Sequence, residues 1–263
     1  MARRAAEAGL DVIALTDHDT LAGVPEATAA GDRLGLRVIP GCEFSVAGPG
    51  GEMHLLAYFL PCGDPAVERF LADQRAHRAT RAREIVRRLQ HSGVSISEGD
   101  VRRAAGPGDA LGRPHVARAM MAKGVVGQLQ EAFDRFLGQG RPAYVPKTLP
   151  SVETVAALAR SVGGVTSAAH LKDRGVRPVL EQLRKAGVDG AEVLHPSHDP
   201  ATVKRITRLA TELGLLPTGG TDWHGSAVGD RPLLPLGGLQ VPHHWLDALE
   251  RLHAARVPEE AKR

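Results

Sequence analysis

Residues 12–19 read VIALTDHD, and this stretch decides the fold because an apolar run leads directly into two acids and a histidine. Short runs rich in Val and Ile are typical of buried strands, so residues 12–16 are predicted to form one. Asp17, His18 and Asp19 then follow at its carboxyl end. In parallel α/β folds the carboxyl ends of the strands carry the active site. The stretch therefore predicts both a strand and a place for chemistry.

The alternation of strands and helices continues on both sides of a central helical region. Further strands are predicted over residues 37–40, 53–59, 165–169, 190–194 and 215–221. Helices are predicted over residues 24–34, 65–91, 113–123, 128–137, 151–163, 176–186, 199–213 and 244–255. Ser, Asp and Gly at several of these boundaries are typical helix caps. Repeated βα units with Val- and Ala-rich strands predict a parallel sheet, open or closed into a barrel.

The helical region divides the chain. Residues 65–141 contain no good strand pattern, and three or four helices follow one another there. We therefore predict the first part of an α/β barrel at residues 1–64, a helical insertion at 65–141 and the second part of the barrel at 142–263. A chain of 263 residues with 43% hydrophobic content can bury such a core.

Composition narrows the class of protein. No apolar run approaches the ~18 residues that span a bilayer, and residues 1–9 lack the apolar stretch of a secretory signal. Two cysteines cannot build a disulfide framework or a four-cysteine zinc site, so we expect a cytoplasmic protein. Two Trp, two Tyr and five Phe argue against stacking platforms for single strands, while a net charge of +3 is compatible with a polyanionic substrate.

Potential metal ligands gather at the predicted strand ends. They are Asp17, His18, Asp19, Glu43, His170, His195, His198, Asp222 and His224, with His54 opening the third strand. Because strand ends converge in space, we expect one shared pocket. Nitrogen and oxygen donors without a thiolate suit zinc, manganese or iron(II). Their number exceeds what one tetrahedral ion uses, so two or more divalent ions are expected.

Each of these residues also has a purely structural interpretation. His54 or His170 could be a hydrogen-bonded core histidine, Asp17 could cap the following helix, and Asp222 could form an Asx turn. We favour the shared pocket because the structural interpretation would have to hold for all of the residues at once.

In order and spacing, the motifs resemble those of the polymerase-and-histidinol-phosphatase (PHP) superfamily. They are TDHD at 16–19, GCE at 41–43, MHL at 53–55, AH at 169–170 and GTDWH at 220–224. Two further segments, LGRPH at 111–115 and AYVP at 143–146, resemble its stand-alone bacterial branch. That branch acts on nucleoside 3′,5′-bisphosphates and on short RNA or DNA from the 5′ end.

The resemblance implies a distorted seven-stranded βα barrel with a trinuclear site for Mn²⁺, Zn²⁺ or Fe²⁺. The implied metal ligands are His18, Glu43, His54, His170, Asp222 and His224. Asp17 would orient His18, His198 would contact phosphate or metal, and His195 is less suited to either role. The candidate phosphate contacts from the insertion are Arg113 and His115, and Lys147 is a weaker candidate beyond it.

One feature of the family pattern is missing from this sequence. The family opens with a strand that ends in a His-x-His pair, whereas Met1 aligns inside the helix that follows it. An unrecognised upstream start is the explanation we favour. The alternative is a barrel without its first strand and with an exposed sheet edge. We expect the 263-residue form to be weakly active or inactive.

The predicted function is hydrolysis of terminal phosphates of nucleotides or short oligonucleotides by a metal-activated water, with no membrane and no obligate protein partner. Histidinol-phosphate phosphatase, a catalytically impaired PHP-like binding module and a metal-dependent amidohydrolase are the alternatives. The helical insertion speaks against the first and the remaining ligands against the second. No lysine at a strand end suits the third.

The long helix predicted at residues 65–91 is rich in basic residues. They are Arg75, His77, Arg78, Arg81, Arg83, Arg87 and Arg88. The interpretation we favour is an amphipathic helix with a solvated basic face. The alternative is a contact surface for a nucleic-acid backbone.

Overall fold

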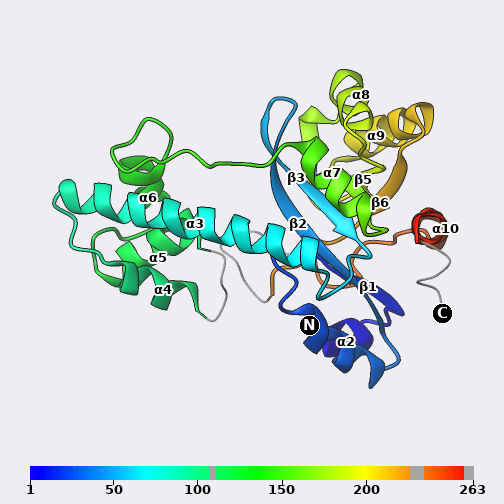
Figure 1. The fold of residues 1–263 in the computed structure, drawn as a ribbon, viewed down its shortest axis with the longest axis horizontal. Coiled ribbons are helices and arrows are strands. Elements are labelled where there is room, and N and C mark those ends of the chain that lie inside the picture. Colours follow the sequence, from blue (N-terminus) through cyan, green and yellow to red (C-terminus); the bar gives the residue numbers. More distant parts are fainter. Residues whose placement is uncertain (107–110, 226–233, 258–263) are drawn as a thin grey trace. The chain divides into compact units, whose positions relative to one another are not determined.

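The computed structural model describes residues 1–106, 111–225 and 234–257, which form two compact units (Figure 1). The first unit comprises Met1–Glu68 and Leu149–Arg263, and the second comprises Arg69–Thr148. The first unit holds the sheet and the second is helical. Every helix in the described ranges is too short or too polar to cross a membrane.

A six-stranded sheet in the order β1-β2-β3-β4-β5-β6 forms the centre of the first unit. Its strands are β1 (Val12–Leu15), β2 (Arg37–Gly48), β3 (Gly51–Tyr58), β4 (Val165–Ala168), β5 (Gly190–Leu194) and β6 (Leu216–Gly219). The pairs β1–β2, β4–β5 and β5–β6 are parallel. The mixed α/β fold predicted from the sequence is confirmed.

The prediction of a uniformly parallel sheet is wrong at β3. This strand runs antiparallel to both β2 and β4, because the tight turn at Gly50 and Gly51 returns the chain directly beside β2. β2 is also longer than predicted, since it pairs with β1 through its first residues and with β3 through the rest. Glu43 therefore lies inside β2 instead of following it.

The first unit also contains α-helices. They are α1 (Ala2–Glu7), α2 (Val24–Asp32), α7 (Val152–Ser161), α8 (Arg177–Lys185), α9 (Pro200–Leu213) and α10 (His243–Arg256). α7 and α9 contact strands of the β2–β6 part, and α2 lies against β2 (Figure 1). Ser151 and Asp199 cap α7 and α9 by accepting hydrogen bonds from Thr154 N and Thr202 N, as their positions predict.

The second unit has its own apolar core. The helix α3 (Pro65–His91) runs into it, and α4 (Glu98–Ala105), α5 (Arg113–Ala122), α6 (Leu129–Ala132) and a π-helical turn (Phe133–Leu137) follow. Ile85, Leu89, Met120 and Leu137 are among its fully buried side chains. α4 was not separately predicted, although Ser97 and Asp100 form a capping box at its start.

Candidate metal centre

His18 and Glu43 are brought together by pairing of the loop after β1 with β2. Glu43 N donates to Asp17 O and Asp19 N donates to Glu43 O, both at 3.1 Å, so the loop continues the parallel ladder. This places His18 Nε2 at 3.7 Å from Glu43 Oε2. The buried Asp19 carboxylate also lies 3.4 Å from Ser45 N, which holds the loop to the strand.

His54 reaches the same place because β3 is antiparallel. Its partner across the sheet is Ser45, two residues from Glu43, so His54 and Glu43 lie diagonally on one face of the sheet. His54 Nδ1 is 2.6 Å from Glu43 Oε1. His54, in the first half of β3, can thus reach Glu43 in the neighbouring strand.

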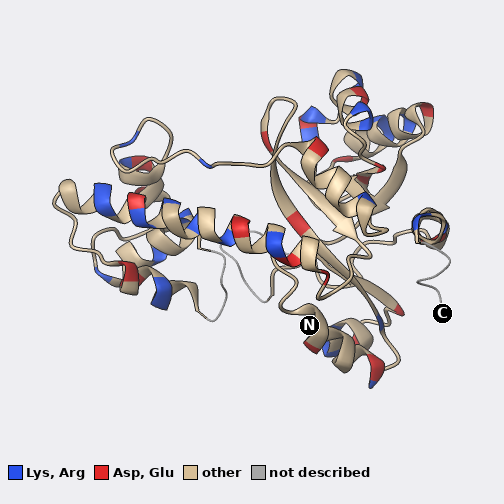
Figure 2. Ribbon diagram, viewed as in Figure 1, with Lys and Arg blue, Asp and Glu red and all other residues tan. Residues whose placement is uncertain are grey.

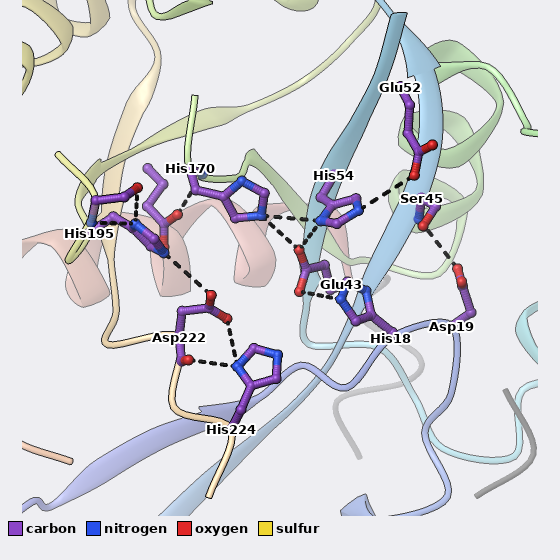
Figure 3. A network of polar contacts seen from close by, with 12 residues as sticks. His18, Asp19, Glu43, Ser45, Glu52, His54, His170, His195, Asp222 and His224 are labelled. Carbon is purple, nitrogen blue, oxygen red and sulfur yellow. Dashed lines mark hydrogen bonds and ion pairs between the residues drawn. The ribbon is translucent and has the colours of Figure 1, made fainter. Parts of the chain in front are cut away.

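His170 completes this group from the end of β4. Its Nε2 lies 3.1 Å from both Glu43 Oε1 and His54 Nδ1 (Figure 3). The His170 backbone is in the left-handed region, with φ of 30°, and its N–H donates to Glu192 Oε2 at 2.7 Å. Glu192 therefore fixes the turn that aims His170 at Glu43.

Glu43 and the imidazoles around it stabilise each other's charged forms. Burial alone would raise the pKa of Glu43, but hydrogen bonds from His170 and His54 and the charge of His18 hold it well below its ordinary value. Burial alone would lower the pKa of His170, but Glu43 raises it above its ordinary value. Glu43 is therefore an ionised carboxylate that accepts hydrogen bonds from His54 and His170, while His18 lies 3.7 Å away as a third imidazole.

Asp222 and His224 stand in the loop after β6. His224 Nδ1 lies 2.7 Å from Asp222 O and 3.4 Å from Asp222 Oδ1, so this imidazole faces its own loop. The carboxylate of Asp222 is 3.6 Å from His195 Nε2, and His195 is 5.5 Å from the His170 ring (Figure 3). Burial alone would raise the pKa of Asp222, but nearby His195 and His224 lower it below its ordinary value.

A cavity of about 960 Å³ joins these groups. His18, Glu43, His170, Asp222 and His224 all line it. The expected convergence of ligand-type side chains on one pocket is therefore seen for these five residues. His54 lines a smaller cavity of about 460 Å³, which it shares with His170.

Sequence reasoning missed Glu192. This carboxylate is buried in β5, lines the large cavity and has its pKa raised to about 7 by burial, while His195 and His170 oppose the rise. The signal was a single acid within the otherwise apolar strand GAEVL at 190–194. An acid in a buried strand is costly and so indicates a partner or a function.

His198 and Asp17, both predicted to act in the reaction, lie outside the group around Glu43. His198 Nδ1 donates to Val193 O at 2.9 Å and its Nε2 accepts from Lys172 N at 3.1 Å, so the backbone uses both ring nitrogens. Asp17 lines the large cavity, and burial raises the pKa of its carboxyl although His18 lowers it. A role for either residue in the reaction stays a prediction.

The three predicted phosphate contacts belong to the second unit. Arg113 lies 5.7 Å and 5.8 Å from the centres of the Phe133 and Tyr144 rings, a cation–π arrangement. His115 Nδ1 accepts from Gly112 N, and burial together with nearby arginines lowers the pKa of His115. Lys147 follows the last helical turn of this unit. Their contact with substrate stays a prediction.

A few acidic residues are interspersed among the basic residues along α3 (Figure 2). Arg87 and Arg88 each donate to Glu84 at 2.8 Å, and Arg81 donates to Val145 O at 2.8 Å. Arg83 also bonds within the helix, to the Thr80 hydroxyl. These contacts favour the amphipathic-helix interpretation over a surface for nucleic acid.

An α/β fold with imidazoles and carboxylates gathered beside one sheet edge is the architecture of metal-dependent hydrolases. Residues 1–104 match the model of the PHP domain. A Chromobacterium violaceum 3′,5′-nucleoside bisphosphate phosphatase is 31% identical over 235 residues, which cover 87% of this chain and 82% of the relative. A 5′-3′ exoribonuclease of Haemophilus influenzae is 30% identical, with 85% and 83% covered. The chain belongs to the PHP family, as its motifs predict.

A solved structure shows the same fold. A Bifidobacterium adolescentis protein, described as a candidate metal-dependent phosphoesterase, superposes with a TM-score of 0.82 at 30% identity. The match covers 100% of this chain and 91% of that one. The predicted PHP-type α/β architecture is thereby confirmed over the whole chain.

Proposed function

We propose that this protein is a metal-dependent phosphoesterase that removes terminal phosphates from nucleotides or short oligonucleotides. The observation that carries the proposal is the cluster of His18, Glu43 and His54, whose ligand atoms all lie within 4.8 Å of one another. The relatives named as a bisphosphate phosphatase and an exoribonuclease support this substrate class. Because nucleotides are cytoplasmic metabolites, we also propose that the protein acts in the cytoplasm.

The donor set fits divalent ions. Three imidazoles around one ionised carboxylate offer the nitrogen and oxygen donors that Zn²⁺, Mn²⁺ and Fe²⁺ prefer. His18, Glu43, His54 and His170 would hold one ion, and Asp222 and His224 would contribute to a second or third. Such ions lower the pKa of a bound water and neutralise charge on a phosphoryl group.

The protein's own residues supply the preorganisation. Glu43 stays ionised because imidazoles surround it, so it is ready to bind a cation without first losing a proton. Glu192 holds the His170 backbone, and Asp19 holds the loop that carries His18. Fixed ligands of this kind reduce the reorganisation that binding requires.

The test is a metal-dependent assay. Chelated protein is reloaded with Mn²⁺, Zn²⁺ or Fe²⁺ and given a nucleoside 3′,5′-bisphosphate, a 5′-phosphorylated oligoribonucleotide and histidinol phosphate. We expect turnover of one of the first two substrates only with metal. His54→Ala should reduce both metal content and turnover by at least ~100-fold, since a ligand is lost, whereas the exposed His91→Ala should change neither.

Each alternative has its own result in this assay. Preferred hydrolysis of histidinol phosphate would replace the proposal by the other phosphatase of the superfamily. Stable metal binding without turnover of any phosphoester would replace it by a binding module. Equal turnover by the His54→Ala and His91→Ala variants would remove the proposed ligand cluster.

A further inference from the structure

His195 carries a buried nitrogen that the proposed metal cluster does not use. The residue follows β5 and is only 8% exposed. Its Nε2 is buried and has no hydrogen-bond partner among the described residues. Its neighbours His170 and Asp222 line the large cavity, although His195 itself does not. Buried polar atoms nearly always have partners in folded proteins, so an exception next to these two residues indicates a missing ligand.

Hydrogen bonds at the other ring nitrogen assign the tautomer of His195. Its Nδ1 accepts from the Ser197 backbone N–H at 3.0 Å and lies 2.7 Å from Ser197 Oγ. A backbone N–H can only donate, so Nδ1 carries no proton. In the neutral imidazole the proton is then on Nε2. His195 therefore presents a donor, and no lone pair, at its buried end.

The donor faces the metal centre. Its Nε2 lies 3.6 Å from Asp222 Oδ2, too far for a hydrogen bond, and the His170 ring is 5.5 Å from the His195 ring (Figure 3). Nearby His198 makes a clear contrast, because both of its ring nitrogens are bound to backbone groups. Of these two histidines, only His195 has a ring nitrogen left for a ligand.

We propose that His195 donates a hydrogen bond from Nε2 to an oxygen of the phosphoryl group bound at the metal centre. The inference rests on the proposed phosphoesterase function and adds one substrate-contacting residue to it. A phosphoryl oxygen is a charged acceptor, and hydrogen bonds to charged acceptors are short and strong. A metal ion is a poor occupant for this position because Nε2 offers no lone pair in this tautomer.

The tautomer itself can be measured in the native chain. Two-bond ¹H–¹⁵N correlation of the metal-loaded protein should give His195 one protonated nitrogen, at Nε2, and one unprotonated nitrogen, at Nδ1. Protonated Nδ1 with a metal-shifted Nε2 would overturn the proposal and make His195 a metal ligand. This measurement does not depend on the folding of any variant.

Two variants test the contact with phosphate. His195→Phe keeps a ring of similar size but removes the donor, and His195→Gln can place an amide N–H near the position of Nε2. In metal-saturated protein, His195→Phe should bind inorganic phosphate ~10-fold more weakly by calorimetry and lose ~100-fold in kcat. Metal content should stay that of the parent, and His195→Gln should recover part of both losses.

The remaining outcomes separate this inference from the proposed function. A parent protein that turns over a nucleotide while His195→Phe binds phosphate and reacts equally well would overturn the role of His195 alone. Loss of metal in His195→Phe, with unchanged phosphate affinity after saturation, would overturn it in favour of a positioning role on Asp222. A parent that neither hydrolyses phosphoesters nor binds phosphate would overturn both.

Discussion

Glu192→Gln is predicted to stabilise the metal-free protein at neutral and higher pH. Burial raises the pKa of Glu192 to about 7 from an ordinary 4.5, against the opposing effect of His195 and His170. One pKa unit corresponds to ~1.4 kcal/mol, so ionised Glu192 costs the folded state ~3 kcal/mol. Glutamine has the same shape without the charge, and its amide oxygen can still accept the His170 N–H.

The pH range in which Glu192→Gln changes stability follows from the pKa of Glu192, which is higher in the folded than in the unfolded protein. Below pH 4.5 folded and unfolded chains both hold the proton, and the Glu192→Gln variant should match the parent. Between pH 4.5 and about 7 the parent alone loses stability, and the difference then stays constant at higher pH.

Denaturant unfolding of chelated protein at about pH 4.5, 6 and 8 measures the difference. The exposed Glu153→Gln is the matched control and should stay within ~0.5 kcal/mol of the parent at every pH. A Glu192→Gln variant that is no more stable than the parent at the highest pH would refute the reasoning. A gain in stability that does not change with pH would refute it as well.

Two further predictions concern the packing of the first unit and of its sheet. Arg256→Ala should lower the free energy of unfolding by ~3 kcal/mol, because the Arg256 side chain is only 14% exposed and binds the buried carboxylate of Asp189 through both terminal guanidinium nitrogens. Arg208→Ala removes an exposed ion pair with Glu212 and should lower the free energy of unfolding by less than ~1 kcal/mol. Equal losses of stability in the Arg256→Ala and Arg208→Ala variants would contradict this reasoning. Gly190→Ala should cost ~2 kcal/mol or more, since its Cβ would lie 2.5 Å from a backbone oxygen of β6. Gly99→Ala is the control, because α4 has room for a Cβ at this position, and it should be neutral or slightly stabilising. Thermal unfolding compares the Gly190→Ala and Gly99→Ala variants. Similar shifts in Tm would argue against the close approach of β5 and β6.

Local sequence signals predicted where helices and strands lie, whereas pairing between distant segments determined the direction and length of the strands. The predicted bounds of α3 and β5 agree with the structure, because caps, glycines and apolar periodicity act within a few residues. The direction of β3 could not be obtained in this way. It depends on which strands lie beside β3, and β4 comes more than a hundred residues later in the chain. The length of β2 has the same origin, since its two halves pair with different partners.

The composition of the candidate site was predictable, but the roles of its residues were less so. The types and order of His18, Glu43 and His170 were enough to predict that they meet. The roles of Glu192 and His195 depend on contacts with distant or backbone groups. For Glu192 the decisive contact is the His170 N–H, and for His195 it is the backbone N–H of Ser197. A sequence motif contains neither contact.

The strained residues of the site show that the two buried glutamates have different tasks. Asp19, His170 and Asp222 all have positive φ, of 51°, 30° and 49°, in the loops that follow β1, β4 and β6. Residues other than glycine adopt a positive φ only where neighbouring groups fix the backbone, at a cost of ~1–3 kcal/mol each. The Glu43 carbonyl fixes Asp19 and the Glu192 carboxylate fixes His170. Glu43 thus binds the imidazoles with its side chain, whereas Glu192 aims one of them by holding its backbone. Because these tasks differ, removing Glu192 should misplace His170 while leaving the contact between His54 and Glu43 intact.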